Sequence, residues 1–159
     1  MEHTFDESQL FYDRMKKGGI NCVSCEKKCL SLLEGLTDKE LALLNEKRTV
    51  INYRMGETIY EQGTVSDNLF CLNKGKAKVT IGETDGNELI VELRKPVDFL
   101  GFGEFIAGKK YQTTAVALED SSVCVIYKED FWKILKRNSE FDLRIMNFFA
   151  DELSKAQHK

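Results

Sequence analysis

The 159-residue sequence predicts an α+β fold in which an antiparallel β barrel, roll or sandwich lies between helical segments. Short runs rich in β-branched and aromatic residues fill residues 50–126, and this composition is typical of strands. Glycines separate the runs, while the residues on both sides show helical periodicity. Many short strands at this spacing, with a single proline at Pro96, indicate an antiparallel architecture.

The composition is that of a globular protein, because 42% of the residues are hydrophobic and 31% are charged. No apolar run approaches the ~20 residues that a membrane span requires. The acidic start lacks the apolar segment of a secretory signal, and five cysteines without such a signal fit a reducing compartment. We therefore expect a cytoplasmic protein. Its net charge of −3 offers no general basic surface for nucleic acid.

Residues 1–35 predict an arm followed by a cysteine-containing loop. The arm, residues 1–21, has scattered apolar side chains and a Gly18-Gly19 hinge near its end. After the loop, Thr37 and Glu40 stand in the spacing of a capping box. They predict a short helix that ends near Lys47.

The strand-like runs are residues 58–60, 69–72, 77–81, 89–93, 114–118 and 123–126. The dipeptide Asp85-Gly86 separates two of them, and Asp-Gly is a strong signal for a β-hairpin. We therefore expect the third and fourth runs to pair.

The C-terminal residues predict one short helix over 128–136 and a longer one that begins near Ser139. The longer helix carries two apolar rows. Phe141, Ile145 and Phe148 form one row, which can cover the β domain. The other row steps by three, four and three residues, the spacing of a coiled-coil seam, and predicts a dimer interface of Met146, Phe149, Leu153 and Ala156. A single broad stripe buried within one domain is the alternative interpretation.

Three closely spaced cysteines and one distant cysteine form the sharpest chemical pattern: Cys22, Cys25, Cys29 and Cys124. Clustered thiols at such spacing indicate metal binding, and a distant fourth ligand would join two parts of the fold. This arrangement suits a sensor better than an enzyme. Inert, unmetallated thiols are the alternative, and Cys71 is either a buried apolar residue or a spare ligand.

Residues 54–63 and 69–77, together with the order of helix, glycine-punctuated strands, short helix and long helix, carry a family resemblance. From residue 36 to 159 the sequence resembles the sensor half of the CRP/FNR transcription regulators. The resemblance implies an antiparallel double-stranded β-helix, or jelly roll, of the cyclic-nucleotide-binding type over 36–137. It also implies that residues 138–159 start a homodimerisation helix. In the family a DNA-binding helix-turn-helix domain follows, at the point where this sequence stops.

The family's cyclic-nucleotide cassette is half present. Gly103 and Glu104 match its first part, but Thr113, followed by Thr114, stands where the family has arginine. A neutral hydroxyl cannot replace the charge-assisted pair between arginine and phosphate. We therefore do not expect cyclic nucleotide binding. A metal-free regulatory domain that binds a cyclic-nucleotide-like small molecule through these four residues stays as the alternative function.

The family's second signal is oxygen, which is read by a four-iron, four-sulfur (4Fe-4S) cluster. Residues 117–124 resemble the segment that carries the distant ligand, Cys124, and Cys22 and Cys25 match the first loop ligands. Cys29 lies two residues before the family position, which falls near Ser31. The leading prediction is a non-enzymatic redox or oxygen sensor with an iron–sulfur cluster that controls dimerisation. Zinc at these thiols is the second prediction for the metal.

Overall fold

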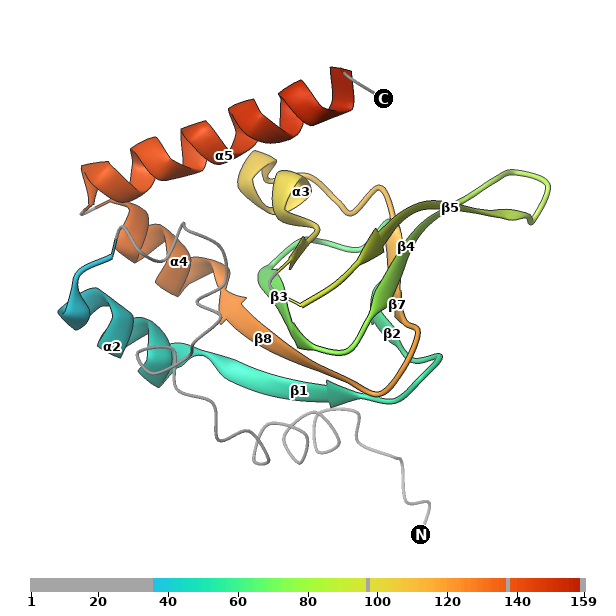
Figure 1. Cartoon of the computed structure of the whole chain (residues 1–159), viewed down its shortest axis with the longest axis horizontal. Helices are drawn as coiled ribbons and strands as arrows, with labels where there is room; N and C mark the ends of the chain where they lie inside the picture. Colours follow the sequence, from blue (N-terminus) through green and yellow to red (C-terminus); the bar gives the residue numbers. More distant parts are fainter. Residues whose placement is uncertain (1–35, 97, 137, 158–159) are drawn as a thin grey trace, which may run out of the picture.

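The computed structural model describes residues 36–96, 98–136 and 138–157 (Figure 1). The N-terminal arm and the loop cysteines Cys22, Cys25 and Cys29 lie outside these residues, so the predictions made for them stay predictions. The described residues have the predicted order of helix, strands, short helix and long helix, and they add a short helix over 102–107 between the strands.

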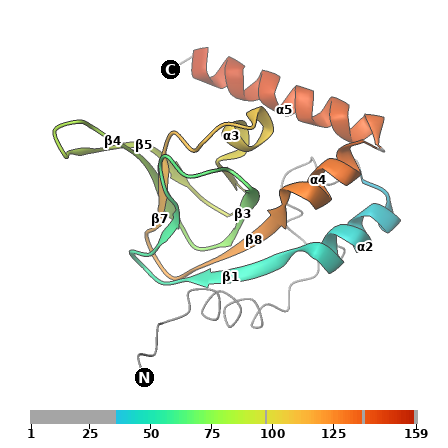
Figure 2. The same cartoon turned by 180° about the vertical axis from the view of Figure 1, so that it is seen from behind.

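Eight antiparallel strands form two four-stranded sheets, which confirms the predicted jelly roll. The first sheet has the order β1-β8-β3-β6 and the second β2-β7-β4-β5. The strands are β1 (Thr49–Tyr53), β2 (Thr58–Tyr60), β3 (Asn68–Lys74), β4 (Ala77–Gly82), β5 (Glu88–Arg94), β6 (Phe99–Leu100), β7 (Thr114–Ala117) and β8 (Ser121–Tyr127). As predicted, β4 and β5 pair through a turn at Gly86, which has a φ of 85°. This hairpin projects from the body of the domain in both views (Figures 1 and 2).

Four helices complete the described chain: α2 (Asp38–Lys47), α3 (Phe102–Ala107), α4 (Lys128–Leu135) and α5 (Ser139–Gln157). The capping box of α2 is confirmed, because the Thr37 hydroxyl accepts from the Glu40 amide at 3.2 Å while the Glu40 carboxylate accepts from the Thr37 amide at 3.0 Å. At the start of α5, the Asn138 side chain accepts from the Phe141 amide at 3.0 Å. The cap of α5 therefore lies one residue before the predicted start.

Two apolar cores lie on opposite faces of the first sheet. Along β8, Val123 and Val125 face the interior of the roll, whereas Cys124 and Ile126 face the helices. This alternation follows from the two-residue period of a strand, and it confirms that Cys124 shares a face with Ile126. β8 therefore belongs to both cores.

The helix-side core determines which face of α5 is buried. Phe141 and Ile145 are buried in it, and Phe148 packs against it, as predicted for the first row. In the second row, Met146 is 67% exposed and Leu153 is 61% exposed, and Ala156 is exposed as well. Phe149 differs from these three, because its ring stacks on Phe102 with the ring centroids 5.0 Å apart. The two apolar rows therefore separate less fully than the heptad spacing predicts.

One close approach fixes the connection between β3 and β4. Gly75 has a φ of 101°, and a Cβ at this position would come within 2.1 Å of the Ser121 hydroxyl. Only glycine satisfies both the left-handed backbone and the contact.

Candidate functional site: a charged cavity and a cysteine pair

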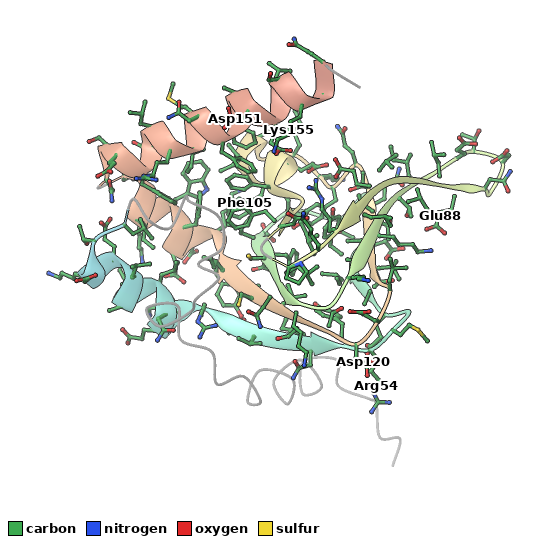
Figure 3. The ribbon with its side chains drawn as sticks, in the orientation of Figure 1. Arg54, Glu88, Phe105, Asp120, Asp151 and Lys155 are labelled. Atoms are coloured by element: carbon green, nitrogen blue, oxygen red, sulfur yellow. The ribbon has the colours of Figure 1, made fainter. Side chains whose placement is uncertain are left out.

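A cavity of about 590 Å³ lies where the roll, α3 and α5 meet. Its walls come from distant parts of the sequence: Tyr60 from β2, Val91, Glu92 and Arg94 from β5, Phe102 to Glu104 from α3, Thr113 before β7, and Phe148 to Lys155 from α5. In Figure 3, Asp151 and Lys155 lie on the part of α5 that passes over α3. The helix thus forms one wall of the cavity.

Three of the four predicted ligand residues, Gly103, Glu104 and Thr113, line this cavity. Thr114 does not line it, because its hydroxyl accepts from the Gln62 amide at 3.0 Å between β2 and β7. Thr114 thus makes a structural hydrogen bond, and its predicted ligand role stays a prediction. Thr113 precedes β7, whereas Thr114 is the first residue of this strand.

Thr113 is hydrogen-bonded within the protein. Its hydroxyl lies 3.1 Å from the Tyr60 hydroxyl, and the Tyr60 ring stacks on Tyr111 with centroids 4.1 Å apart. Burial raises the pKa of Tyr60, since desolvation disfavours the phenolate, although the hydrogen bond to Thr113 acts in the opposite direction. At this position the cavity therefore presents two neutral hydroxyl groups, and the Arg94 side chain comes to the same cavity from β5.

The charged residues of the cavity are mostly ones that the sequence pattern did not indicate. Arg94 forms an ion pair with Glu92 on the same strand. Lys155 lies 3.4 Å from Glu152, one turn earlier on α5. Each cation of the cavity therefore has a carboxylate beside it. No local motif marks these residues, because only the folded chain brings β5 and α5 together.

Cys124 and Cys71 are direct partners across β8 and β3. Both are buried in the helix-side core, with exposures of 7% and 1%. The Arg48 guanidinium donates to the Cys124 sulfur at 3.5 Å and to the Asn45 side chain at 3.0 Å. Within residues 36–157 as described, no three or more His, Cys, Asp or Glu side chains gather in a metal-binding group. Of the four predicted ligands, only Cys124 belongs to that range.

The two four-stranded sheets and their flanking helices define a jelly-roll domain of the cyclic-nucleotide-binding type. The chain belongs to the cyclic nucleotide-binding domain family, whose model matches residues 50–138. The resemblance to the sensor half of the CRP/FNR regulators is confirmed by its relatives.

Two curated relatives are transcription regulators. The chain is 27% identical over 107 residues to the transcriptional activatory protein AadR of Rhodopseudomonas palustris, which covers 67% of this chain and 44% of that protein. It is 27% identical over 150 residues to the anaerobic regulatory protein of Pasteurella multocida, which covers 91% of this chain and 54% of that protein. The chain thus spans about half the length of these relatives.

Solved structures confirm the fold. The sensor domain of the transcriptional regulator DNR from Pseudomonas aeruginosa superimposes with a TM-score of 0.72 at 19% identity, and the match covers 80% of this chain and 86% of that one. Among the described residues, no helix is both long and apolar enough to cross a membrane.

Proposed function

We propose that this CRP/FNR-type sensor domain detects oxygen or redox state through an iron–sulfur cluster held by Cys22, Cys25, Cys29 and Cys124. In this proposal the domain is regulatory and not catalytic, and it acts in the cytoplasm. The observation that carries the proposal is the position of Cys124, which is buried against the helices and hydrogen-bonded by Arg48. The similarity to an anaerobic regulatory protein supports the same signal.

The surroundings of Cys124 fit such a cluster. A cluster held by four thiolates carries a net negative charge and supplies one-electron redox chemistry and oxygen sensitivity when bound. The Arg48 guanidinium would offset part of that charge through its hydrogen bond to the Cys124 sulfur. The bond from Arg48 to Asn45 holds the guanidinium in place.

Cys124 is connected to the proposed dimer helix, α5, through β8 and α4. Cys124 lies on β8, and α4 begins at Lys128 directly after this strand. The rings of Phe131 on α4 and Phe141 on α5 are in edge contact, with centroids 5.9 Å apart. We therefore propose that cluster loss alters the pose of α5 and the homodimer contacts of Met146, Phe149, Leu153 and Ala156. In a longer chain this helix would lead to the DNA-binding domain.

Metal analysis after anaerobic purification tests the proposal. Wild-type protein is expected to contain iron and acid-labile sulfide, and the variant Cys124→Ala is expected to lose both. Ser122→Ala is the control, because it changes the residue of β8 that lies two positions before Cys124, and it is expected to keep the cluster. A folded wild-type protein that contains only zinc, or no metal, contradicts the iron–sulfur proposal.

A metal-free regulatory domain that binds a small molecule is the second candidate. The cavity of about 590 Å³ favours it, because this volume suits a drug-sized ligand. Thr113 argues against a cyclic nucleotide as that ligand. Calorimetry with cyclic AMP and cyclic GMP is expected to show no heat of binding, and clear saturable binding would contradict this expectation.

A further inference from the structure

We propose that the cavity binds a small organic cation, an ammonium group attached to an apolar or aromatic body. This inference goes beyond the proposed cluster-based sensing and does not depend on it. It names the ligand class for the second candidate function.

The charges that line the cavity are the first argument. Among the described residues that line it, five are acidic and two are basic, an excess of three negative charges: Glu92, Asp98, Glu104, Asp151 and Glu152 against Arg94 and Lys155. Both cations lie in ion pairs with carboxylates of the same element, Glu92 and Glu152. Within the part of the chain that the structure describes, the cavity wall has no further basic residue beside Asp98, Glu104 and Asp151. An anion would meet repulsion, whereas a cation would be attracted.

The position of Glu104 gives the cation a specific partner. Glu104 lies in the first turn of α3 and lines the cavity. The Ser66 hydroxyl fixes the turn, because it donates to the backbone carbonyls of Glu104 at 3.2 Å and Lys109 at 2.5 Å. A carboxylate on a fixed turn is well suited to accept a hydrogen bond from an ammonium group.

The apolar wall is the second argument. The rings of Phe99, Phe102, Phe148 and Phe149 line the cavity and pack on one another, with centroids 4.8 Å apart for Phe99 and Phe102 and 5.0 Å apart for Phe102 and Phe149. The parts of these rings that line the cavity can bury the apolar body of a ligand. Carboxylates beside aromatic rings are therefore complementary to an amphipathic cation and not to a sugar phosphate.

Three probes with the same skeleton and different charges test the inference: 2-phenylethylammonium, 2-phenylethanol and 3-phenylpropionate. We expect the ammonium probe to bind in calorimetry and to raise the melting temperature, with an affinity at least about tenfold above that of the carboxylate probe. The alcohol is expected to fall between them. Equal affinity for all three probes, or binding of none, overturns the proposal.

Variants locate the binding. Glu104→Gln keeps the size of the side chain and removes its charge, and it is expected to weaken ammonium binding about tenfold. The matched control is Glu119→Gln, an exposed carboxylate outside the cavity, which is expected to bind as wild type does. Unchanged binding in Glu104→Gln overturns the assignment to this cavity. Iron content is measured on the same samples, so failure of ammonium binding and failure of the cluster proposal are seen separately.

Discussion

The hydroxyl groups of Tyr60 and Thr113 lie 3.1 Å apart on the wall of the cavity, at the position where the cyclic-nucleotide cassette has arginine. These two neutral hydroxyl groups do not supply the positive charge with which the cassette's arginine pairs with a phosphate. We predict that Thr113→Arg gains cyclic AMP binding by at least about tenfold over wild type, because a guanidinium restores the charge-assisted pair. Calorimetry measures the gain. Thr113→Gln, which is long but neutral, is the control, and equal behaviour of both variants would count against the role of charge.

The contact between Gly75 and Ser121 predicts a large loss of stability on substitution. Gly75→Ala places a Cβ 2.1 Å from the Ser121 hydroxyl and 2.8 Å from its Cα atom, so backbone must move. We expect unfolding free energy to fall by about 2–4 kcal/mol in urea titrations. Gly86→Ala is the control, because Gly86 also has a positive φ but no atom within 4 Å of an added Cβ. It should lose only about 1 kcal/mol from backbone strain.

Two buried tyrosines predict a loss of stability at alkaline pH. Burial raises the pKa of Tyr60 and of Tyr111 above the ordinary value of 10.0. Their contribution to the free energy of unfolding is complete below the unfolded-state pKa. It is lost as the pH rises through the folded-state pKa, because the unfolded chain then releases protons that the folded chain retains. Urea titrations at pH values from neutrality to above the ordinary tyrosine pKa of 10.0 are expected to show stability that falls only at the upper end.

Removal of one hydroxyl tests the origin of that decline. Tyr111→Phe keeps the ring stack but removes the hydrogen bond that the Tyr111 hydroxyl donates to the Asn68 carbonyl at 2.9 Å. At neutral pH it should cost about 1 kcal/mol. The unfolding free energy of Tyr111→Phe should fall less steeply with alkaline pH than that of wild type. An identical slope would show that other groups cause the decline.

If the proposed cluster is present, Arg48 should tune its reduction potential. Arg48→Gln removes a cationic donor from the Cys124 sulfur, so the more negative reduced state loses stabilisation and the potential shifts downward. A redox titration under argon measures the shift. Arg54→Gln changes an exposed arginine outside the Cys124 surroundings and should leave the potential unchanged. An upward shift in Arg48→Gln contradicts this electrostatic role.

The exposed residues of α5 predict the site of self-association. Leu153→Lys places a charge on a side chain that is 61% exposed, and it should shift a dimer toward monomer in analytical ultracentrifugation. Val65→Lys changes a comparable side chain, 60% exposed, outside α5 and should keep the wild-type mass distribution. A wild-type protein that is monomeric at all concentrations contradicts the proposed interface.

Local signals predicted most of the fold. The capping box at Thr37, the hairpin at Asp85-Gly86 and the alternation around Cys124 each depend on neighbouring residues, and each is confirmed. The two-residue strand β6 was not predicted, since two residues are too few to show a period. Heptad spacing grouped Phe149 with the dimer-interface row, and it could not show that the Phe149 ring also stacks on Phe102 within the domain.

The cavity could be predicted only in part. Gly103, Glu104 and Thr113 follow a sequence cassette, so their shared position was foreseeable. Arg94 and Lys155 reach the same cavity from β5 and α5 without any motif. Their contribution depends on tertiary packing between elements that are far apart in the chain, which no local pattern encodes.

Because β8 contributes alternate side chains to both cores, it cannot shift toward the helices without also disturbing the interior of the roll. The backbone amides of this strand should therefore exchange with solvent only when both cores open together. A group bound on the helix side and a ligand in the cavity would then be thermodynamically linked through one cooperative unit. Each would change the protein's affinity for the other by the same factor.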